Sequence, residues 1–170
     1  MAAAKQRVEQ QPAWVLHTYP WRETSLIVEI FARDHGRVAL VAKGARRPHS
    51  QLRGVLMAFQ PLLMDWSGGG EVKTLVRAEW QGGQPLLTGR ALICGYYLNE
   101  LLVRLTARED AHPRLFSAYA DGVRALGRGE PESPILRRFA LAVLQDLGYE
   151  AGLAHEGDSA EPGLVAQILQ

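Results

Sequence analysis

Positive side chains are concentrated in one stretch of the sequence, GRVALVAKGARRPHSQLRG, between Gly36 and Gly54. From residue 35 to residue 64 there is no Asp or Glu, and the cations are Arg37, Lys43, Arg46, Arg47 and Arg53. Clustered Lys and Arg bind polyanions by displacing the counterions that surround phosphates. The stretch therefore predicts a binding surface for a polyanion, although a loop whose charges serve only solubility would have the same composition.

The remainder of the chain is acidic. The whole sequence has 19 Lys and Arg, of which 14 lie outside this stretch, where they are outnumbered by all 18 Asp and Glu. The contents of hydrophobic residues (47%) and charged residues (22%) are typical of a folded globular protein. No apolar run is long enough to cross a bilayer, and the N-terminus has no apolar signal sequence. We therefore expect a cytoplasmic protein without a membrane segment.

Residues that could catalyse a reaction or bind a metal are poorly arranged. The histidines show no pair at ligand spacing, and Cys94 is the single cysteine, so neither a disulfide nor a thiolate zinc site can form within the chain. Gly68-Gly69-Gly70 is not followed by Lys-Ser/Thr, so it is no phosphate-binding loop. We expect no enzyme, no metal site and no cofactor, since a nuclease or hydrolase would need a carboxylate cluster or an activated nucleophile.

Aromatic residues are frequent in the first half of the chain. Most of them are expected in a core, as in any small β domain. Tyr19 and Trp21 flank Pro20 in a loop and are the best candidates for exposed rings. Exposed aromatic rings beside a basic groove can stack nucleic-acid bases, so Tyr19 and Trp21 join the cationic residues as candidate DNA contacts.

Five strand-like segments precede residue 82. They are Ala13–Tyr19, Ser25–Ala32, Arg37–Ala42, Val55–Trp66 and Glu71–Trp80, with Pro61 indicating an edge, a bulge or a break in the fourth. Five short strands with glycine-rich turns predict a closed or partly closed barrel, and five is the strand number of an OB-fold. Another small barrel or an open meander is the alternative. We assign the barrel, as a DNA-binding domain, to residues 12–82.

The hydrophobic period then changes from two to that of a helix. Helices are predicted over Gly89–Ala107, from Pro113 onward, and from an N-cap at Ser133, with Pro134 at the first helical position, to a C-terminal glycine at Gly148. The overall class is α+β, with a helical domain over residues 86–150. Residues 151–170 form a poorly patterned segment.

Two arginines, Arg137 and Arg138, interrupt the apolar pattern of the last predicted helix. Arginines beside an apolar groove suit a peptide with a hydrophobic anchor and acidic groups or a terminal carboxylate. Arginines that only extend into solvent would fit the pattern equally well.

Six strings, in order, resemble one protein family. HTYPWRETSLIVEIF, HGRVALVAKGARRPHSQLRGVL, FQPLL, GEVKTL, YYLNELL and LRRFALAVLQDLGYE are similar to sequences of the bacterial DNA repair and recombination mediators of the RecO family. The likeness spans about Trp14 to Gly148, and the ordered set is far more specific than any single string.

This resemblance implies an N-terminal OB-fold followed by a helical domain. It implies a nucleoid-associated mediator that binds single- and double-stranded DNA, anneals complementary strands, binds the acidic C-terminal tail of single-stranded DNA-binding protein, and with RecR helps to load RecA. Carried over by position, the cations Lys43, Arg46, Arg47 and Arg53 would contact DNA. Arg137 would receive the acidic tail, in a pocket lined by Tyr97 and Leu101.

Two departures from the family pattern bear on these expectations. Some members carry a cysteine zinc cluster, which this chain with its one cysteine cannot form. Members usually continue well beyond the LGYE string, so we expect this chain to be a fragment or a shortened variant. A different class of function, a protein adaptor that binds partners without useful DNA affinity, is the alternative.

Overall fold

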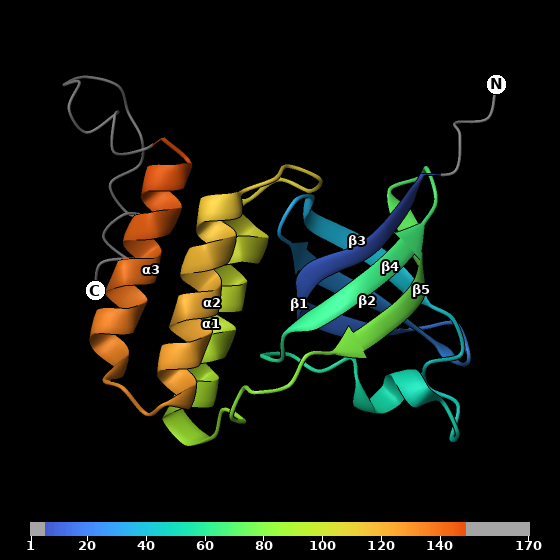
Figure 1. Cartoon of the computed structure of the whole chain (residues 1–170), viewed down its shortest axis with the longest axis horizontal. Coiled ribbons are helices and arrows are strands. Elements are labelled where there is room, and N and C mark those ends of the chain that lie inside the picture. The colour runs from blue at the N-terminus through green and yellow to red at the C-terminus, as the bar shows by residue number, and fades with distance from the viewer. Residues whose placement is uncertain (1–5, 149–170) are drawn as a thin grey trace. The chain divides into compact units, whose positions relative to one another are not determined.

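The computed structural model describes residues 6–148, which contain five β-strands and three α-helices (Figure 1). The strands are β1 (Arg7–Trp21), β2 (Ser25–Ala32), β3 (Gly36–Ala42), β4 (Leu62–Ser67) and β5 (Val72–Trp80), with the short 3-10 helix η1 (Gln51–Gly54) between β3 and β4. The helices are α1 (Gly89–Leu105), α2 (Pro113–Gly127) and α3 (Glu132–Asp146). The predicted α+β class, a five-stranded barrel followed by helices, is confirmed. The expected segment 151–170 lies outside the described residues.

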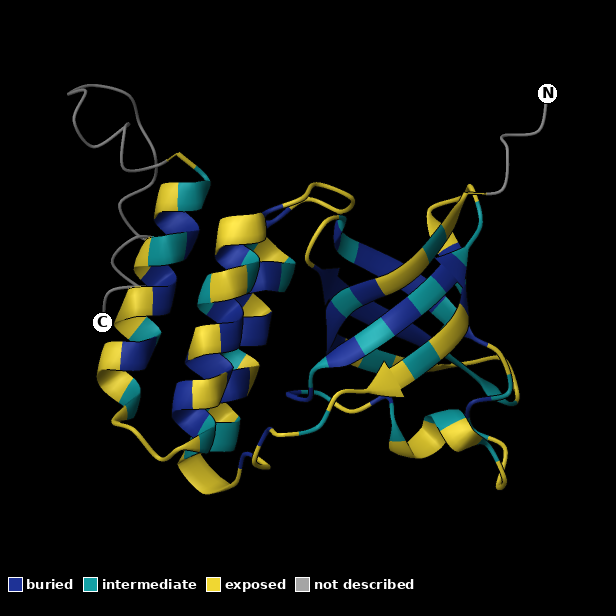
Figure 2. Ribbon diagram, viewed as in Figure 1, coloured by how far each residue is buried: buried dark blue, intermediate teal, exposed yellow. Residues whose placement is uncertain are grey.

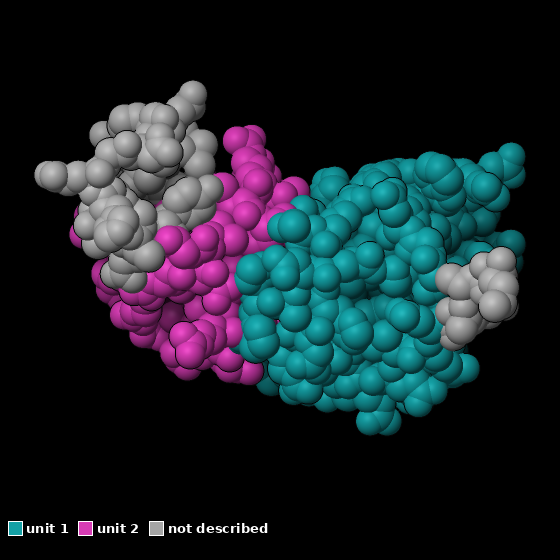
Figure 3. Space-filling view, turned by 90° about the horizontal axis from the view of Figure 1, so that it is seen from above, with its two compact units in different colours: residues 1–86, 107–113 teal, residues 87–106, 114–170 magenta. Residues whose placement is uncertain are grey.

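The chain divides into two compact units, coloured separately in Figure 3. The barrel unit comprises residues 1–86 and 107–113, and the helical unit comprises residues 87–106 and 114–170. Residues 107–113, between α1 and α2, thus belong to the barrel unit. The sequence pattern placed residues 107–113 inside the helical domain and did not indicate that they belong to the barrel unit.

The barrel closes because β1 pairs with a different strand on each side. The last part of β1 pairs with β2, with Trp21 opposite Ser25, and its first part pairs with β4, with Val8 opposite Trp66. The register shifts between Val15 and His17 and again between Val8 and Gln11, as bulges do where a strand bends sharply. The strand order β1-β2-β3-β5-β4 includes one parallel pair, β3 with β5, and gives a closed OB-type barrel.

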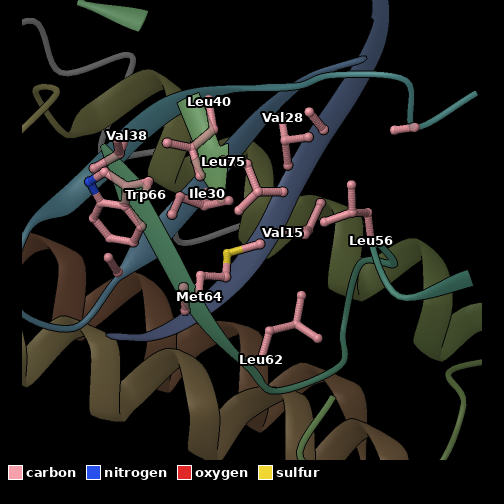
Figure 4. Close-up of a cluster of buried hydrophobic side chains, with 14 residues drawn as sticks. Val15, Val28, Ile30, Val38, Leu40, Leu56, Leu62, Met64, Trp66 and Leu75 are labelled. Atoms are coloured by element: carbon pink, nitrogen blue, oxygen red, sulfur yellow. The ribbon is translucent and has the colours of Figure 1, made fainter. Parts of the chain in front are cut away.

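Alternate side chains of the strands fill the barrel (Figure 4). The core includes Val28 and Ile30 from β2, Leu40 from β3, and Met64 and Trp66 from β4, all at most 1% exposed. This period of two explains why the sequence pattern located β2 and β3 within one residue of their observed ends. Figure 2 shows buried and partly buried residues in alternation along β4, whereas the last six residues of β2 are all buried.

The helical unit has its own core. Leu98 and Leu102 of α1 are fully buried, as are Leu115 and Val123 of α2. A Cβ on Gly122 would lie 3.3 Å from Leu98 Cδ1, so this glycine lets α2 approach α1 closely. The Tyr119 hydroxyl is also buried in this core and donates a hydrogen bond to Asn99 Oδ1. Burial raises the pKa of Tyr119 well above its usual value, so the ring remains neutral.

Three predicted boundaries were wrong. The first strand begins at Arg7 instead of Ala13 and continues to Trp21, so Tyr19 and Trp21 lie at the end of β1 and not in a loop. The fourth strand begins at Leu62 instead of Val55, because Pro61 has no N–H for the ladder and the preceding residues form η1 and turns. Helix α3 begins at Glu132, after an extended Pro131, two residues before the predicted start. Pro134 then lies in the first turn of α3. Backbone N–H groups there have no carbonyl partner within the helix, so proline is tolerated although it lacks an N–H. The C-terminal glycine is confirmed, since Gly148 has φ +79° and its N–H bonds to Gln145 O.

Residues 107–113 are attached to the barrel by ion pairs and backbone contacts. Arg108 pairs with Glu29, whose side chain is 8% exposed, and Glu109 pairs with Lys73, whose side chain is 10% exposed. The Glu109 N–H also donates to Arg37 O at 2.8 Å. Because a buried charge that loses its partner costs about 3–5 kcal/mol, these pairs keep the segment against the strands.

Gly36 lies against the backbone of this segment, so a substitution there tests the contact. It has φ +69°, and a Cβ there would lie 2.1 Å from Asp110 O. Gly36→Ala should lower the free energy of unfolding through both backbone strain and this clash. Gly83→Ala is the matched control, because Gly83 has φ +80° but nothing within 4 Å.

Urea denaturation of both variants separates the two effects. Backbone strain alone predicts a loss of ~1–2 kcal/mol in Gly83→Ala. The clash should add at least ~2 kcal/mol in Gly36→Ala, as overpacked buried sites do. Equal losses in the two variants would show that residues 107–113 do not press on Gly36.

Candidate nucleic-acid interface

The loop after β3 is joined to the turn between β1 and β2 by the side chain and backbone of Arg46. Its Nε donates to Ser25 O at 2.9 Å and its Nη2 donates to Arg22 O at 2.6 Å. Its backbone N–H donates to Thr24 O at 2.8 Å. Two segments that are distant in sequence therefore form one surface, with Arg46 between them.

The loop itself is ordered by local hydrogen bonds. Gly44 has φ +69°, and its N–H donates to Ser25 Oγ at 3.3 Å. The N–H of Arg47 bonds to Gly44 O, and that of Ser50 bonds to Arg47 O, both at 3.0 Å. Ser50 Oγ then accepts from Leu52 N–H and caps η1, in which Arg53 lies. The cations of this loop are consequently presented at defined positions.

We call these grouped cations the basic surface; it consists of Arg22, Lys43, Arg46, Arg47 and Arg53. Lys43, Arg47 and Arg53 are exposed, and within residues 6–148 none of the five forms an ion pair with a carboxylate. Other exposed arginines of the barrel are paired, Arg7 with Glu9 and Arg77 with Glu79. The basic surface thus retains positive charge that a phosphate can neutralise.

Two exposed aromatic rings lie beside the basic surface. Tyr19 is 39% exposed and Trp21 is 43% exposed, as expected from the sequence. The Arg22 guanidinium lies 5.7 Å from the centre of the Trp21 ring, within the range of a cation–π contact. Four other aromatic residues of the first half are instead buried in the barrel unit: Trp14, Phe31, Phe59 and Trp66.

Arg37, the fifth predicted DNA contact of the cationic stretch, is not part of this surface. Its Nη1 lies 3.3 Å from Glu29 Oε2, and its side chain is only 11% exposed. Arg37 is the second residue of β3, and the pairing of β3 with β2 brings its side chain to Glu29, an acid that the cationic stretch itself lacks. Arg37 therefore has a structural contact here, and we leave it out of the interface.

The residues predicted to bind an acidic tail all lie in the helical unit. Arg137 and Arg138 are exposed on α3 and form no ion pair among the described residues. On α1, Tyr97 is partly buried, and Leu101, one turn later, is 7% exposed. The arginines are therefore accessible to a ligand, whereas Leu101 mainly packs inside the unit.

The described residues offer little for catalysis. Among them there is no group of three or more His, Cys, Asp or Glu that could hold a metal ion. Burial raises the pKa of the Cys94 thiol, which disfavours the reactive thiolate. None of the helices in residues 6–148 is both long and apolar enough to cross a membrane.

Comparison with known sequences decides the family. Family models described as "Recombination protein O N terminal" and "Recombination protein O C terminal" match residues 7–83 and 86–168, nearly the whole chain. The chain belongs to the RecO family. The two matches meet between β5 and α1, where the strands give way to helices.

Relatives in the RecO family are very similar to this chain. Proteins named DNA repair protein RecO are 80% identical over 93% of the chain in Aromatoleum aromaticum and 76% identical over 94% in Azoarcus sp.. A third, from Ralstonia nicotianae, is 57% identical over 95% of the chain. The matches cover 66%, 65% and 60% of these proteins, so the RecO-like sequence here spans about two thirds of their length or less.

One exposed aromatic residue of this RecO-family barrel was not predicted from the sequence. Trp80, at the end of β5, is 57% exposed, more than Tyr19 or Trp21. Trp80 lies directly before Gln81-Gly82-Gly83, a turn-forming sequence, and this position could have indicated its exposure. Strand alternation could not identify it, because neighbouring Glu79 is exposed as well.

The two adjacent arginines of the loop should differ in their effect on stability. Arg46→Ala removes two hydrogen bonds from a charged donor and should lower the free energy of unfolding by ~1–3 kcal/mol. Arg47→Ala removes an exposed charge and should change it by less than ~0.5 kcal/mol. Chemical denaturation measures both. Equal effects would contradict the anchoring role of Arg46.

Proposed function

We propose that this chain binds single- and double-stranded DNA through the basic surface and acts as a recombination mediator in DNA repair. The observation that carries the proposal is a group of cations that no carboxylate of residues 6–148 neutralises, held in place by Arg46 across two loops. Proteins named DNA repair protein RecO support this reading by their similarity. The exposed rings of Tyr19 and Trp21 would add base stacking at the edge of the surface.

Binding of this kind does not read sequence. Lysine and arginine contact phosphates, which are the same in every strand, so any strand and its complement are held alike. Neutralised strands repel each other less, which favours annealing of complementary single strands. Loading of RecA, with the help of RecR, onto DNA coated by single-stranded DNA-binding protein is the process that such a mediator would serve.

The competing reading is a protein adaptor without useful DNA affinity. A salt titration of oligonucleotide binding distinguishes the two. Five phosphate contacts to a single strand predict a slope of log K against log salt near −3.5, at ~0.7 per contact. An adaptor should show no measurable binding even at low salt.

Removal of exposed cations from the basic surface tests the DNA proposal directly. Replacement of Lys43, Arg47 and Arg53 by Ala should weaken binding of a labelled mixed-sequence oligonucleotide by at least ~tenfold and flatten the slope by ~2. The loss should be the same for every sequence. Arg46 is kept, because it also orders the loop.

The matched control removes three exposed cations that are already paired with acids. Replacement of Arg7, Arg77 and Arg104 by Ala changes the net charge equally but leaves the basic surface intact. Fluorescence anisotropy should show nearly unchanged affinity for this control. If both triple variants bind alike, general charge and not the basic surface determines DNA binding.

We further propose that the helical unit binds the acidic C-terminal tail of single-stranded DNA-binding protein. Its support is the pair of exposed arginines on α3, Arg137 and Arg138, which no described carboxylate neutralises. Arginine suits a terminal carboxylate because its planar group can donate two parallel hydrogen bonds. Tyr97 on α1 is the partly exposed apolar candidate for the hydrophobic end of the tail.

A labelled acidic peptide with a free C-terminal carboxylate tests this second proposal. Arg137→Ala should weaken its binding by ~tenfold, and amidation of the peptide should have a similar effect. Arg124→Ala is the control, since Arg124 is an exposed α2 cation 3.9 Å from Asp121. Equal affinity of both variants for the peptide would refute the assignment.

A further inference from the structure

The barrel unit contains a pocket whose residues are not part of the basic surface. Its volume is ≈ 390 Å³, and its lining comes from two segments, residues 54–57 at and after the end of η1 and residues 80–86 at and after the end of β5, joined by Gln60. Trp80 Nε1 donates to Gln60 Oε1 at 2.9 Å, and Gln60 Nε2 donates to Gln84 O at 3.4 Å. Side-chain hydrogen bonds thus preform the site.

Apolar side chains of this pocket are exposed to solvent. Met57 is 43% exposed, Trp80 is 57% exposed and Leu86 is 67% exposed. Each could have been a polar residue without loss to the barrel core, since none of the three belongs to it. Apolar side chains gathered around a hollow are typical of a site that binds a ligand or partner.

The pocket adjoins the basic surface through η1. Arg53 directly precedes Gly54, a pocket residue, and the loop that carries Lys43, Arg46 and Arg47 runs into η1. In Figure 1, η1 and the arrowhead of β5 lie at the same lower end of the barrel. The lining that the described residues provide contains no Asp or Glu. A strand on the basic surface would therefore reach the pocket opening with its next nucleotides.

We infer that this pocket receives a base of the bound DNA strand, stacked on the Trp80 indole against Met57 and Val55, while Arg53 contacts the adjacent phosphate. The inference rests on the proposed DNA binding. A base is a flat apolar ring attached to a negative backbone, which matches an apolar pocket with a cation at its edge. Stacking on a ring accepts every base, so the pocket is compatible with binding of any sequence.

The experiment compares two single-stranded oligonucleotides of equal length and charge. One has natural bases, and the other has abasic sites, which keep the phosphates and remove the rings. Wild-type protein should bind the natural strand about tenfold more tightly by fluorescence anisotropy, since stacking of one base has an effect of this size. Tyr19 and Trp21 would contribute to this ratio too, so variants must assign it.

Variants of the pocket then locate the stacking. Trp80→Ala should weaken binding of the natural strand several-fold and leave the abasic strand unchanged, whereas Trp80→Phe should retain most of the preference. Met57→Ala is a second test that leaves the Trp80–Gln60 hydrogen bond intact. Val76→Ala, an exposed apolar residue of the same strand outside the pocket, is the control and should bind as wild type does.

The outcomes separate this inference from the proposed function. If natural and abasic strands bind equally, or if the preference survives both Trp80→Ala and Met57→Ala, the base pocket is refuted while DNA binding stands. If an acidic peptide with an apolar side chain, and not DNA, quenches tryptophan fluorescence of the wild type but not of Trp80→Phe, the pocket belongs to a peptide and the inference is overturned. If neither strand binds at low salt, both proposals are overturned.

Discussion

Pairing of β1 on both of its sides is the constraint on which the barrel depends. One strand can serve β2 and β4 only if it bends, and its two register shifts provide the bends. A closed barrel has no free strand edge with which the connecting loops could pair. Backbone groups of these loops must therefore find other hydrogen-bonding partners. Arg46 supplies them for the turn after β1, where it binds the carbonyls of Arg22 and Ser25. Barrel closure and the candidate interface are thus connected.

Whether a cation keeps an unneutralised positive charge depends on which acceptor its side chain contacts. Arg37 and Lys73 reach carboxylates, so their charge is neutralised inside the barrel unit. Among the acceptors that residues 6–148 provide, Arg46 reaches carbonyl oxygens and no carboxylate, so its N–H groups are bonded but its net charge stays in place. A hydrogen-bonded arginine can therefore remain available to attract phosphate, because carbonyl dipoles orient the guanidinium without cancelling it.

Local patterns in the sequence predicted most of the barrel and helices, because alternation and helical spacing depend on neighbouring residues. They failed where contacts between distant residues decide the outcome. Arg37 counts as one of five clustered cations until Glu29 is placed beside it, and no spacing brings residues 107–113 onto the strands. The base pocket was likewise invisible, since it joins residues 54–57 to residues 80–86. Exposure of Tyr19 and Trp21 was predictable from the neighbouring proline.

Residues 107–113 make the barrel discontinuous in sequence. A gene fragment that ends after β5 would encode all five strands yet lack Arg108 and Glu109, the partners of Glu29 and Lys73. Such a fragment would expose two charges that the intact chain neutralises within a largely buried environment. The barrel is therefore not a module that can be exchanged between proteins by cutting once at the family boundary near residue 85. A transferred barrel would also need residues 107–113, which lie between α1 and α2 in the sequence.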